Sequence, residues 1–438
     1  VPMPSWKVFM IQFLNIAGTG PIFGAIMGAK FGPSCYLWIV FGSIFAGAFH
    51  DYMTGMLSIR SGGMSVPHIG GHVLGKSAKK LLLVFSVALL LLVGVVFVYS
   101  PAMILSDIAG KNNMLSLMIW INVVFVYYII ATLLPVDKVI GRIYPLFAFA
   151  LIFMAVGLMI GLIVKCPAIP ELWDGLQNRG PSVGMNGQNI FPCLFITIAC
   201  GAISGFHATQ TPIMARCLKN EKMGRPVFYG AMITEGLVAL VWASVSSYFF
   251  FAGGAAEVGS EMTAAAPVIV TDVSTSWLGV FGGILAVLGV VAAPITSGDT
   301  AFRSARLIAS DFLHLKQDKI AKRLLLALPL FSIAIMLFFM DFEKLWRYFA
   351  WTNQSLACIV LWTMAIAQSR RCKPYNLCLY PAIFMTFICS TYIMVAGEGF
   401  ELEPVVGYII GGSITFIAFV AFEAWVILVR NKKYKKAN

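Results

Sequence analysis

Residues 15–24 read Asn-Ile-Ala-Gly-Thr-Gly-Pro-Ile-Phe-Gly and lie in a stretch without charged side chains that runs from Val8 to Ala29. The stretch is long enough for a membrane-spanning helix, which needs about 20 apolar residues. A continuous helix is disfavoured, because Gly18 and Gly20 weaken it and Pro21 lacks a backbone donor. The sequence therefore predicts a span that breaks near mid-membrane and lines a cavity there. Such breaks are typical of the substrate sites of secondary transporters.

The composition is typical of an all-α polytopic membrane protein. Of the 438 residues, 59% are hydrophobic and 11% are charged, whereas soluble domains have about 25% charged residues. No soluble domain fits between the apolar stretches. We expect about twelve spans, near 8–30, 34–58, 81–108, 114–135, 143–164, 189–213, 226–252, 274–297, 323–340, 344–368, 377–397 and 404–429.

The basic residues predict the orientation in the membrane. With a cytoplasmic N-terminus, all but six of the 31 lysines and arginines fall inside; the six are Lys30, Lys111, Lys165, Arg179, Lys344 and Arg347. This asymmetry fits the positive-inside rule, and both ends are expected in the cytoplasm. The net charge of +12 thus indicates loops at a lipid bilayer and no nucleic-acid partner. The chain begins at Val1 without a signal peptide, and one further preceding helix would place the true N-terminus outside.

The chain divides into two halves at a Pro- and Gly-rich outer loop. The second half opens with another interrupted span, which has small and polar residues between Ile196 and Pro212. Two interrupted helices that each open a set of five predict a 5+5 inverted repeat. We expect a first repeat over 1–164, the outer loop over 165–188, a second repeat over 189–368, and two peripheral helices with a basic cytoplasmic tail over 369–438.

The first break predicts a carboxylate site. The half-helix that starts near Pro21 presents free N–H groups and the positive end of its dipole, which bind a carboxylate without a cationic side chain. Gly18 and Gly20 give access to the backbone, Thr19 adds a hydroxyl donor, and the Asn15 amide lines the cavity. The alternative is a glycine-rich packing face between helices.

The second break is expected to face the first and to complete the substrate site with Ser204, Phe206 and His207. An ionisable residue within a span is a functional candidate, and histidine titrates where a proton can couple to transport. The alternative for His207 is a hydrogen bond to a freed backbone carbonyl. Phe206 is either a lid over the substrate or a core residue.

Two places are candidates for the coupling ion. His50-Asp51 closes the second span as a proton carrier or ion ligand, unless Asp51 pairs with Arg60 or another loop base. Thr296 and Ser297, beside the carbonyls freed near Ala17, are hard oxygen ligands that suit Na⁺. Asp299 either adds a charge there or forms an i,i+4 pair with Arg303.

Other residues are expected to be structural. Glu235 and Glu423 also lie in spans and are interpreted as bundle-interior or interface residues. The nine cysteines include no CxxC pair and are interpreted as small apolar fillers.

These residues together resemble the carbon starvation protein A (CstA) family. The matching stretches are Ile16-Ala-Gly-Thr-Gly-Pro-Ile22, Leu37-Trp-Ile-Val-Phe-Gly-Ser-Ile-Phe-Ala-Gly-Ala-Phe-His-Asp51, Ser204-Gly-Phe-His207 and Thr296-Ser-Gly-Asp-Thr-Ala-Phe-Arg-Ser-Ala-Arg306. The resemblance implies a LeuT-like fold related to the amino acid–polyamine–organocation superfamily. It also implies a bacterial inner (plasma) membrane location and uptake of peptides or pyruvate driven by an ion gradient.

The sequence departs from the family in two ways. Many members have a His-His pair where this chain has Ile11-Gln12, which puts proton coupling by that pair in doubt. Longer members also have an N-terminal helix and extra C-terminal spans, so the chain resembles a compact member.

We therefore expect a secondary active symporter for a small carboxylate-bearing nutrient, with alternating access. A channel or facilitator for the same solutes is the alternative. An intramembrane protease with Asp51 and Asp299 as its dyad is less favoured, because the two carboxyls would have to share a proton. With no HExxH or GxSxG motif, the chain is not expected to be an enzyme. No cofactor is expected beyond Na⁺ or H⁺, although His50-Asp51 leaves a metal site conceivable, and the sequence does not fix the oligomeric state.

Overall fold

The structure is a computed structural model that describes residues 2–437 except 111–112, 134–136, 186, 314, 316 and 318. The side chains of 132–143, 311 and 429–437 also lie outside the description. The predicted membrane side of Lys111 and Lys316 therefore falls on residues outside the description. The same holds for the side chains of Lys138, Arg142 and the basic tail.

The described residues form helices joined by turns and loops, with one isolated bridge between Met3 and Leu218. The α-helices are α1 (Ser5–Ala17), α2 (Gly20–Ala29), α3 (Ser34–Phe41), α4 (Ala48–Arg60), α5 (Val66–Leu74), α6 (Lys76–Ile108), α7 (Met114–Leu133), α8 (Asp137–Lys165), α9 (Phe195–Thr197), α10 (His207–Ala215), α11 (Gly230–Phe251), α12 (Gly254–Val258), α13 (Ala266–Ala286), α14 (Ala292–Leu313), α15 (Ile320–Leu337), α16 (Phe342–Arg370), α17 (Asn376–Val395) and α18 (Pro404–Ala437). Short 3₁₀ segments lie at Leu172–Asp174, Gly180–Val183 and Glu221–Met223, and π-helical segments at Gly42–Gly47, Ile190–Leu194, Arg225–Tyr229 and Val287–Val291.

Nine helices of the described chain are long and apolar enough to cross a membrane. They coincide with nine of the predicted spans, and α1 with α2 forms a tenth if the bent pair counts as one span. The predicted span 34–58 is helical throughout, over α3, a π-helical segment and α4, whereas 189–213 is helical only in part; neither is among the nine. The chain is therefore a multi-pass membrane protein, and the full count of twelve stays a prediction.

The predicted span 274–297 begins inside a longer helical run. This run covers Ala266–Ser310 and changes direction at Gly279, where φ is +61°. Only glycine adopts that conformation at low cost. The kink therefore separates the first part of α13 from the length that continues into α14.

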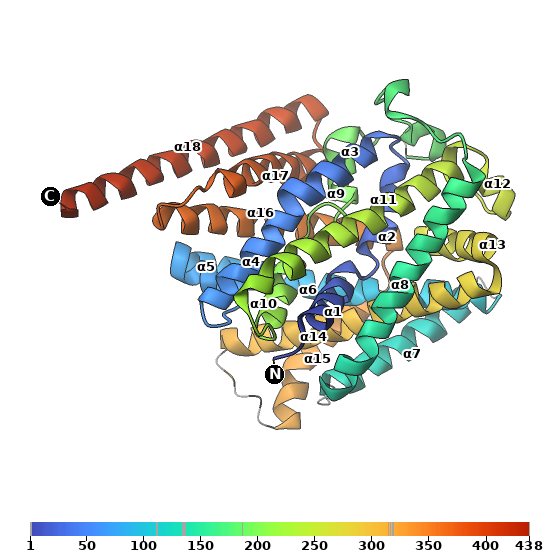
Figure 1. The fold of residues 1–438 in the computed structure, drawn as a ribbon, viewed down its shortest axis with the longest axis horizontal. Coiled ribbons are helices and arrows are strands. Elements are labelled where there is room, and N and C mark those ends of the chain that lie inside the picture. The colour runs from blue at the N-terminus through green and yellow to red at the C-terminus, as the bar shows by residue number, and fades with distance from the viewer. Residues whose placement is uncertain are drawn as a thin grey trace.

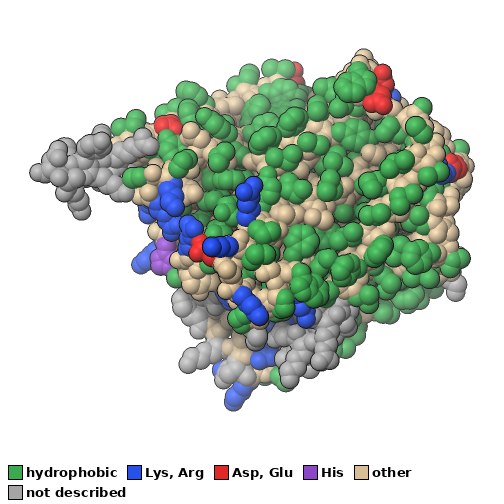
Figure 2. Space-filling view, viewed as in Figure 1, with side chains coloured by type: hydrophobic (Ala, Val, Ile, Leu, Met, Phe, Trp, Pro, Cys, Tyr) green, Lys and Arg blue, Asp and Glu red, His purple; other side chains and the backbone are tan. Residues whose placement is uncertain are grey.

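The helices lie side by side in one bundle, with α1 and α2 near its centre (Figure 1). At one edge, α18 packs on α17, and α17 packs on α16. In the view of Figure 2, the lysine and arginine side chains gather near α4, α5 and α10, whereas several acidic side chains lie at the opposite end. A broad apolar surface separates the two ends, as expected for a protein surrounded by lipid.

Candidate functional site

The first predicted break is confirmed between α1 and α2, which meet at an angle of 44°. Gly18 has φ +46°, and a Cβ there would come within 2.6 Å of the Phe97 ring, so both conformation and space require glycine. The α2 helix begins at Gly20 with Pro21 in its first turn. Buried around the break are the Thr19 hydroxyl and Asn15 Oδ1, neither of which has a hydrogen-bond partner among the described atoms.

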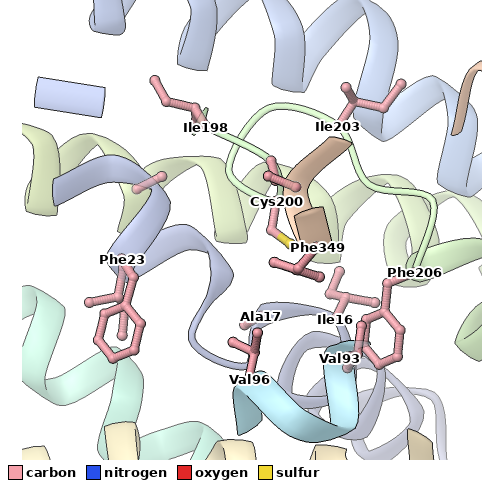
Figure 3. Packing of buried hydrophobic residues seen from close by; sticks show 14 of the residues in the cluster. Ile16, Ala17, Phe23, Val93, Val96, Ile198, Cys200, Ile203, Phe206 and Phe349 are labelled. Atoms are coloured by element: carbon pink, nitrogen blue, oxygen red, sulfur yellow. The ribbon is translucent and has the colours of Figure 1, made fainter. Parts of the chain in front are cut away.

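The second break covers Ile198–Phe206, between α9 and α10. It ends before the stretch of small and polar residues does, because His207 already begins α10 and Thr209 and Thr211 are helical. The two breaks touch: a Cβ at Gly20 would overlap Cys200, and one at Gly201 would lie 3.7 Å from the Cα of Pro21. Figure 3 shows Cys200 of the second break opposite Ala17 of the first.

Two neighbouring amides of α16 hold the second break open. Gln354 Nε2 donates to the carbonyls of Phe195, Ile198 and Ala199 at 3.2–3.3 Å. Asn353 Oδ1 accepts from the Ser204 hydroxyl at 3.0 Å and from the Phe206 amide at 2.8 Å. Both amide side chains are fully buried. Side chains of another helix thus satisfy backbone groups that a continuous helix would satisfy internally.

Replacing Gln354 with leucine should destabilise the protein, because it removes the donor shared by three buried carbonyls. Leaving one buried group without a partner costs about 1–3 kcal/mol. We expect a clear drop in the thermal unfolding midpoint of the purified protein in detergent. Gln368→Leu on the same helix is the matched control, because among the described residues Gln368 Nε2 donates one weak hydrogen bond, to Met53 Sδ at 3.8 Å. Equal midpoints for the two variants would contradict the assigned role.

Next to the second break lies a buried cluster of two histidines and two acids, which we call the His-acid cluster: His50, Asp51, His207 and Glu235. His50 Nδ1 and His207 Nδ1 each lie 2.8 Å from one oxygen of Asp51. His207 Nε2 faces Glu235 Oε2 at 3.4 Å. All four side chains have no solvent exposure, so each charge depends on its neighbours.

The cluster decides between alternatives that the sequence left open. Asp51 does not pair with Arg60, whose Nε instead lies 2.6 Å from Glu221. His207 pairs with Asp51 rather than with a freed carbonyl. The predicted substrate residue His207 and the predicted ion residues His50 and Asp51 thus form one connected group.

The second predicted ion site lies elsewhere, along α14. Ser297 Oγ donates to the Leu14 carbonyl at 3.4 Å, so the site does reach the end of α1 near Ala17. The Thr296 hydroxyl donates to Ala293 in its own helix. Asp299 lies 3.2 Å from Arg303 and forms the i,i+4 pair that was the alternative.

Phe206 is 1% exposed and stacks edge to face on Phe97 with ring centroids 6.1 Å apart. Since the Phe97 ring also packs against Gly18, Phe206 is a buried residue next to the first break. A cavity of about 130 Å³ lies near the breaks, and Met27, Lys30, Thr197, Glu343 and Arg347 are among the residues that line it.

Sequence reasoning placed Glu235 in the bundle interior or at an interface, and its burial confirms the interior position, but its contact with His207 was missed, as were Cys200 and the Asn353-Gln354 pair. Glu235 carries a recognisable signal, an acid in the middle of an apolar span, but its partner His207 lies on another helix. The amide pair likewise stands within an apolar helix. Its function depends on a break more than 140 residues away in sequence, as the separations of the hydrogen bonds show.

Comparison with known proteins adds a family match. The model of the family described as "Carbon starvation protein CstA" matches residues 1–110 and 92–278. An uncharacterized membrane protein of Haemophilus influenzae is 46% identical in an alignment of 294 residues, and the match covers 57% of this chain and 79% of that protein.

The relatives with named activities are transporters. The peptide transporter CstA of Escherichia coli is 27% identical and covers 63% of this chain, and the pyruvate/proton symporter BtsT of the same organism is 29% identical and covers 55%. The chain spans about half the length of these two relatives, 47% and 42%. These names agree with the expectation that the chain is not an enzyme.

Among solved structures, a variant of the manganese transporter of Eremococcus coleocola superposes with a TM-score of 0.62. The match covers 98% of both chains at 14% sequence identity. At this identity the likeness shows a shared fold and nothing about the solute.

Proposed function

Since the chain belongs to the carbon starvation protein CstA family, we propose that it is a secondary active transporter. It imports a small carboxylate-bearing nutrient, pyruvate or a short peptide, by ion-coupled symport. The observation that carries this proposal is the contact between two interrupted helices, Gly20 against Cys200, in the interior of the bundle. Irregular backbone within a membrane is tolerated where it forms a solute site.

The substrate carboxylate binds at the first turn of α2. There the half-helix dipole is positive, and the buried Thr19 hydroxyl, which has no hydrogen-bond partner among the described atoms, can donate to the carboxylate. Ser204 and Phe206 line the opposite side of the site from the second break. We place the outer mouth at the cavity near the breaks, whose lining holds Lys30 together with the paired side chains of Arg347 and Glu343.

The proposed architecture is a LeuT-like 5+5 inverted repeat with two extra C-terminal helices, which makes twelve spans. It is supported by the two breaks, each of which opens one half of the chain, and by the shared fold with a transporter over nearly the full length. Rocking of one bundle against the other gives alternating access. We place both ends in the cytoplasm and the chain in the bacterial inner membrane, in line with the positive-inside rule.

Two places compete for the coupling ion. Na⁺ would bind at Thr296 and Ser297 beside the freed carbonyls of α1. H⁺ would bind in the His-acid cluster, whose histidines and carboxylates are connected by contacts of 2.8–3.4 Å.

Uptake into proteoliposomes tests the function. Labelled pyruvate and a labelled dipeptide are supplied while a Na⁺ or an H⁺ gradient is imposed separately. We expect one of the solutes to accumulate above its equilibrium level under one of the gradients. Equilibration without accumulation would instead indicate a facilitator or channel, and no flux of either solute would refute the proposed substrates.

A further inference from the structure

We propose that Glu235 carries the coupled proton, and that protonation of the His-acid cluster removes a negative charge that would otherwise repel the substrate carboxylate. This inference rests on the proposed function and names its coupling ion and the residue that binds it. It stands on the geometry of four buried side chains and their place beside the two breaks.

The hydrogen bonds fix where the protons of the cluster lie. An ionised carboxylate only accepts hydrogen bonds. With Asp51 ionised, its 2.8 Å contacts with Nδ1 of His50 and Nδ1 of His207 assign a proton to Nδ1 of both rings. The remaining nitrogen of His207, Nε2, faces Glu235 at 3.4 Å, so this pair can hold one proton or two.

The charge of the cluster follows from that count. With one proton between His207 and Glu235, the pair is neutral overall and Asp51 leaves the cluster with a charge of −1. With a second proton, His207 is an imidazolium, Glu235 is a neutral acid, and the cluster is neutral. Binding one proton therefore changes the cluster from −1 to zero.

Glu235 is the member whose charge is least stabilised. Both of its oxygens are buried without a hydrogen bond among the described atoms, whereas both oxygens of Asp51 are bonded. An ionised carboxylate in such a place is costly, and a neutral acid is far less so. Glu235 is therefore the carboxylate that takes and releases the second proton.

Few other groups face Glu235. A ring nitrogen of His207 in α10 and Sγ of Cys200 in the second break lie within 4.8 Å of a Glu235 carboxylate oxygen and of each other. Asp51 of α4 contacts the other nitrogen of His207. Charged side chains on the elements packed against α11 otherwise lie near the ends of those elements, as described for Lys7, Lys30, Arg60, Lys165, Arg225 and Glu257. No described lysine or arginine forms an ion pair with Glu235 that would neutralise its charge in place of a proton.

The position of the cluster links the proton to the substrate. Cys200 lies between the cluster and the first break, where it packs against Gly20 at the start of α2. The side chain of Cys200 thus separates Glu235 from the proposed carboxylate site. In a medium of low dielectric, a charge of −1 at that range opposes a second anion strongly. The proton and the carboxylate therefore bind together, which is the requirement for symport.

The first test separates coupling from substrate movement in proteoliposomes. We expect Glu235→Gln, which imitates the protonated acid, to reduce pyruvate accumulation driven by a pH gradient at least about tenfold, while pyruvate exchange at equal pH falls no more than about threefold. Glu235→Asp, which restores a carboxyl group, should recover part of the driven accumulation. The control is Glu423→Gln, because Glu423 is a half-buried acid of the peripheral helix α18. Accumulation by Glu235→Gln at the level of this control would overturn the proposal.

The second test does not depend on the substrate. Infrared difference spectra of the purified protein between acidic and alkaline pH should show a protonated-carboxyl band that is lost in Glu235→Gln and kept in Glu423→Gln. If wild-type protein moves neither solute but shows this band, the proposed function fails and the proton site stands. A band unchanged in Glu235→Gln would overturn the proton site. So would one tightly bound zinc ion per chain that Cys200→Ser removes, because Glu235 would then be a metal ligand.

Discussion

Uptake of the transported solute should fall at least about a hundredfold when Asp51 is replaced by asparagine. The asparagine side chain has no charge and a single acceptor oxygen, whereas Asp51 accepts from both His50 and His207. Removing one partner of a buried ion pair costs about 3–5 kcal/mol, and a hundredfold change corresponds to about 3 kcal/mol. Exchange at equal pH should be lost as well, because His207 loses the group that orients it beside the second break.

The measurement is the initial rate of uptake, normalised to the amount of protein in the membrane. Asp272→Asn is the control, because Asp272 is a partly buried acid of α13 that lines a separate cavity with Thr271 and Thr275. Uptake by Asp51→Asn within about threefold of the control would show that the cluster contributes less than about 1 kcal/mol to transport.

A methyl group at Gly20 should also impair transport. The Cβ of an alanine there would overlap the Cβ and Sγ of Cys200, so the two breaks could not remain in contact. Overpacking of this kind costs about 1–3 kcal/mol. We expect Gly20→Ala to lower the thermal unfolding midpoint in detergent and to reduce uptake at least about tenfold.

A compensating change makes this prediction specific. Cys200→Gly removes both clashing atoms, so the double variant Gly20→Ala/Cys200→Gly should regain stability and part of the uptake. Gly283→Ala is the control, because a Cβ at that helical position meets its nearest atom at an ordinary distance of 3.6 Å. Failure of the double variant to recover would mean that the contact between the breaks is not the reason for glycine at position 20.

The first break could be located from the sequence because its cause is local. Gly18, Gly20 and Pro21 disfavour a helix wherever they stand, and the structure ends α1 and begins α2 among them. The nine long apolar helices were predictable for a similar reason, since the bilayer requires continuous apolar stretches.

The second break could be predicted only approximately. Its sequence has small residues over a range, and which of them leave the helix depends on the hydrogen bonds from Asn353 and Gln354. In the same way, the sequence offered Arg60 or another loop base as the ion-pair partner of Asp51, and no pattern in consecutive residues indicated His207. His207 is the partner in the structure because α4 and α10 pack together.

The sequence by itself determined that the chain is a helical membrane protein of the CstA family with a broken first span, because apolar length, helix breakers and family motifs are written in consecutive residues. Only the tertiary structure decided that Gly20 meets Cys200, that two amides of α16 support the second break, and that Glu235 joins His207, Asp51 and His50. The physical reason is that a buried polar group is stabilised by partners from other helices. Those partners are fixed by packing and not by distance along the chain.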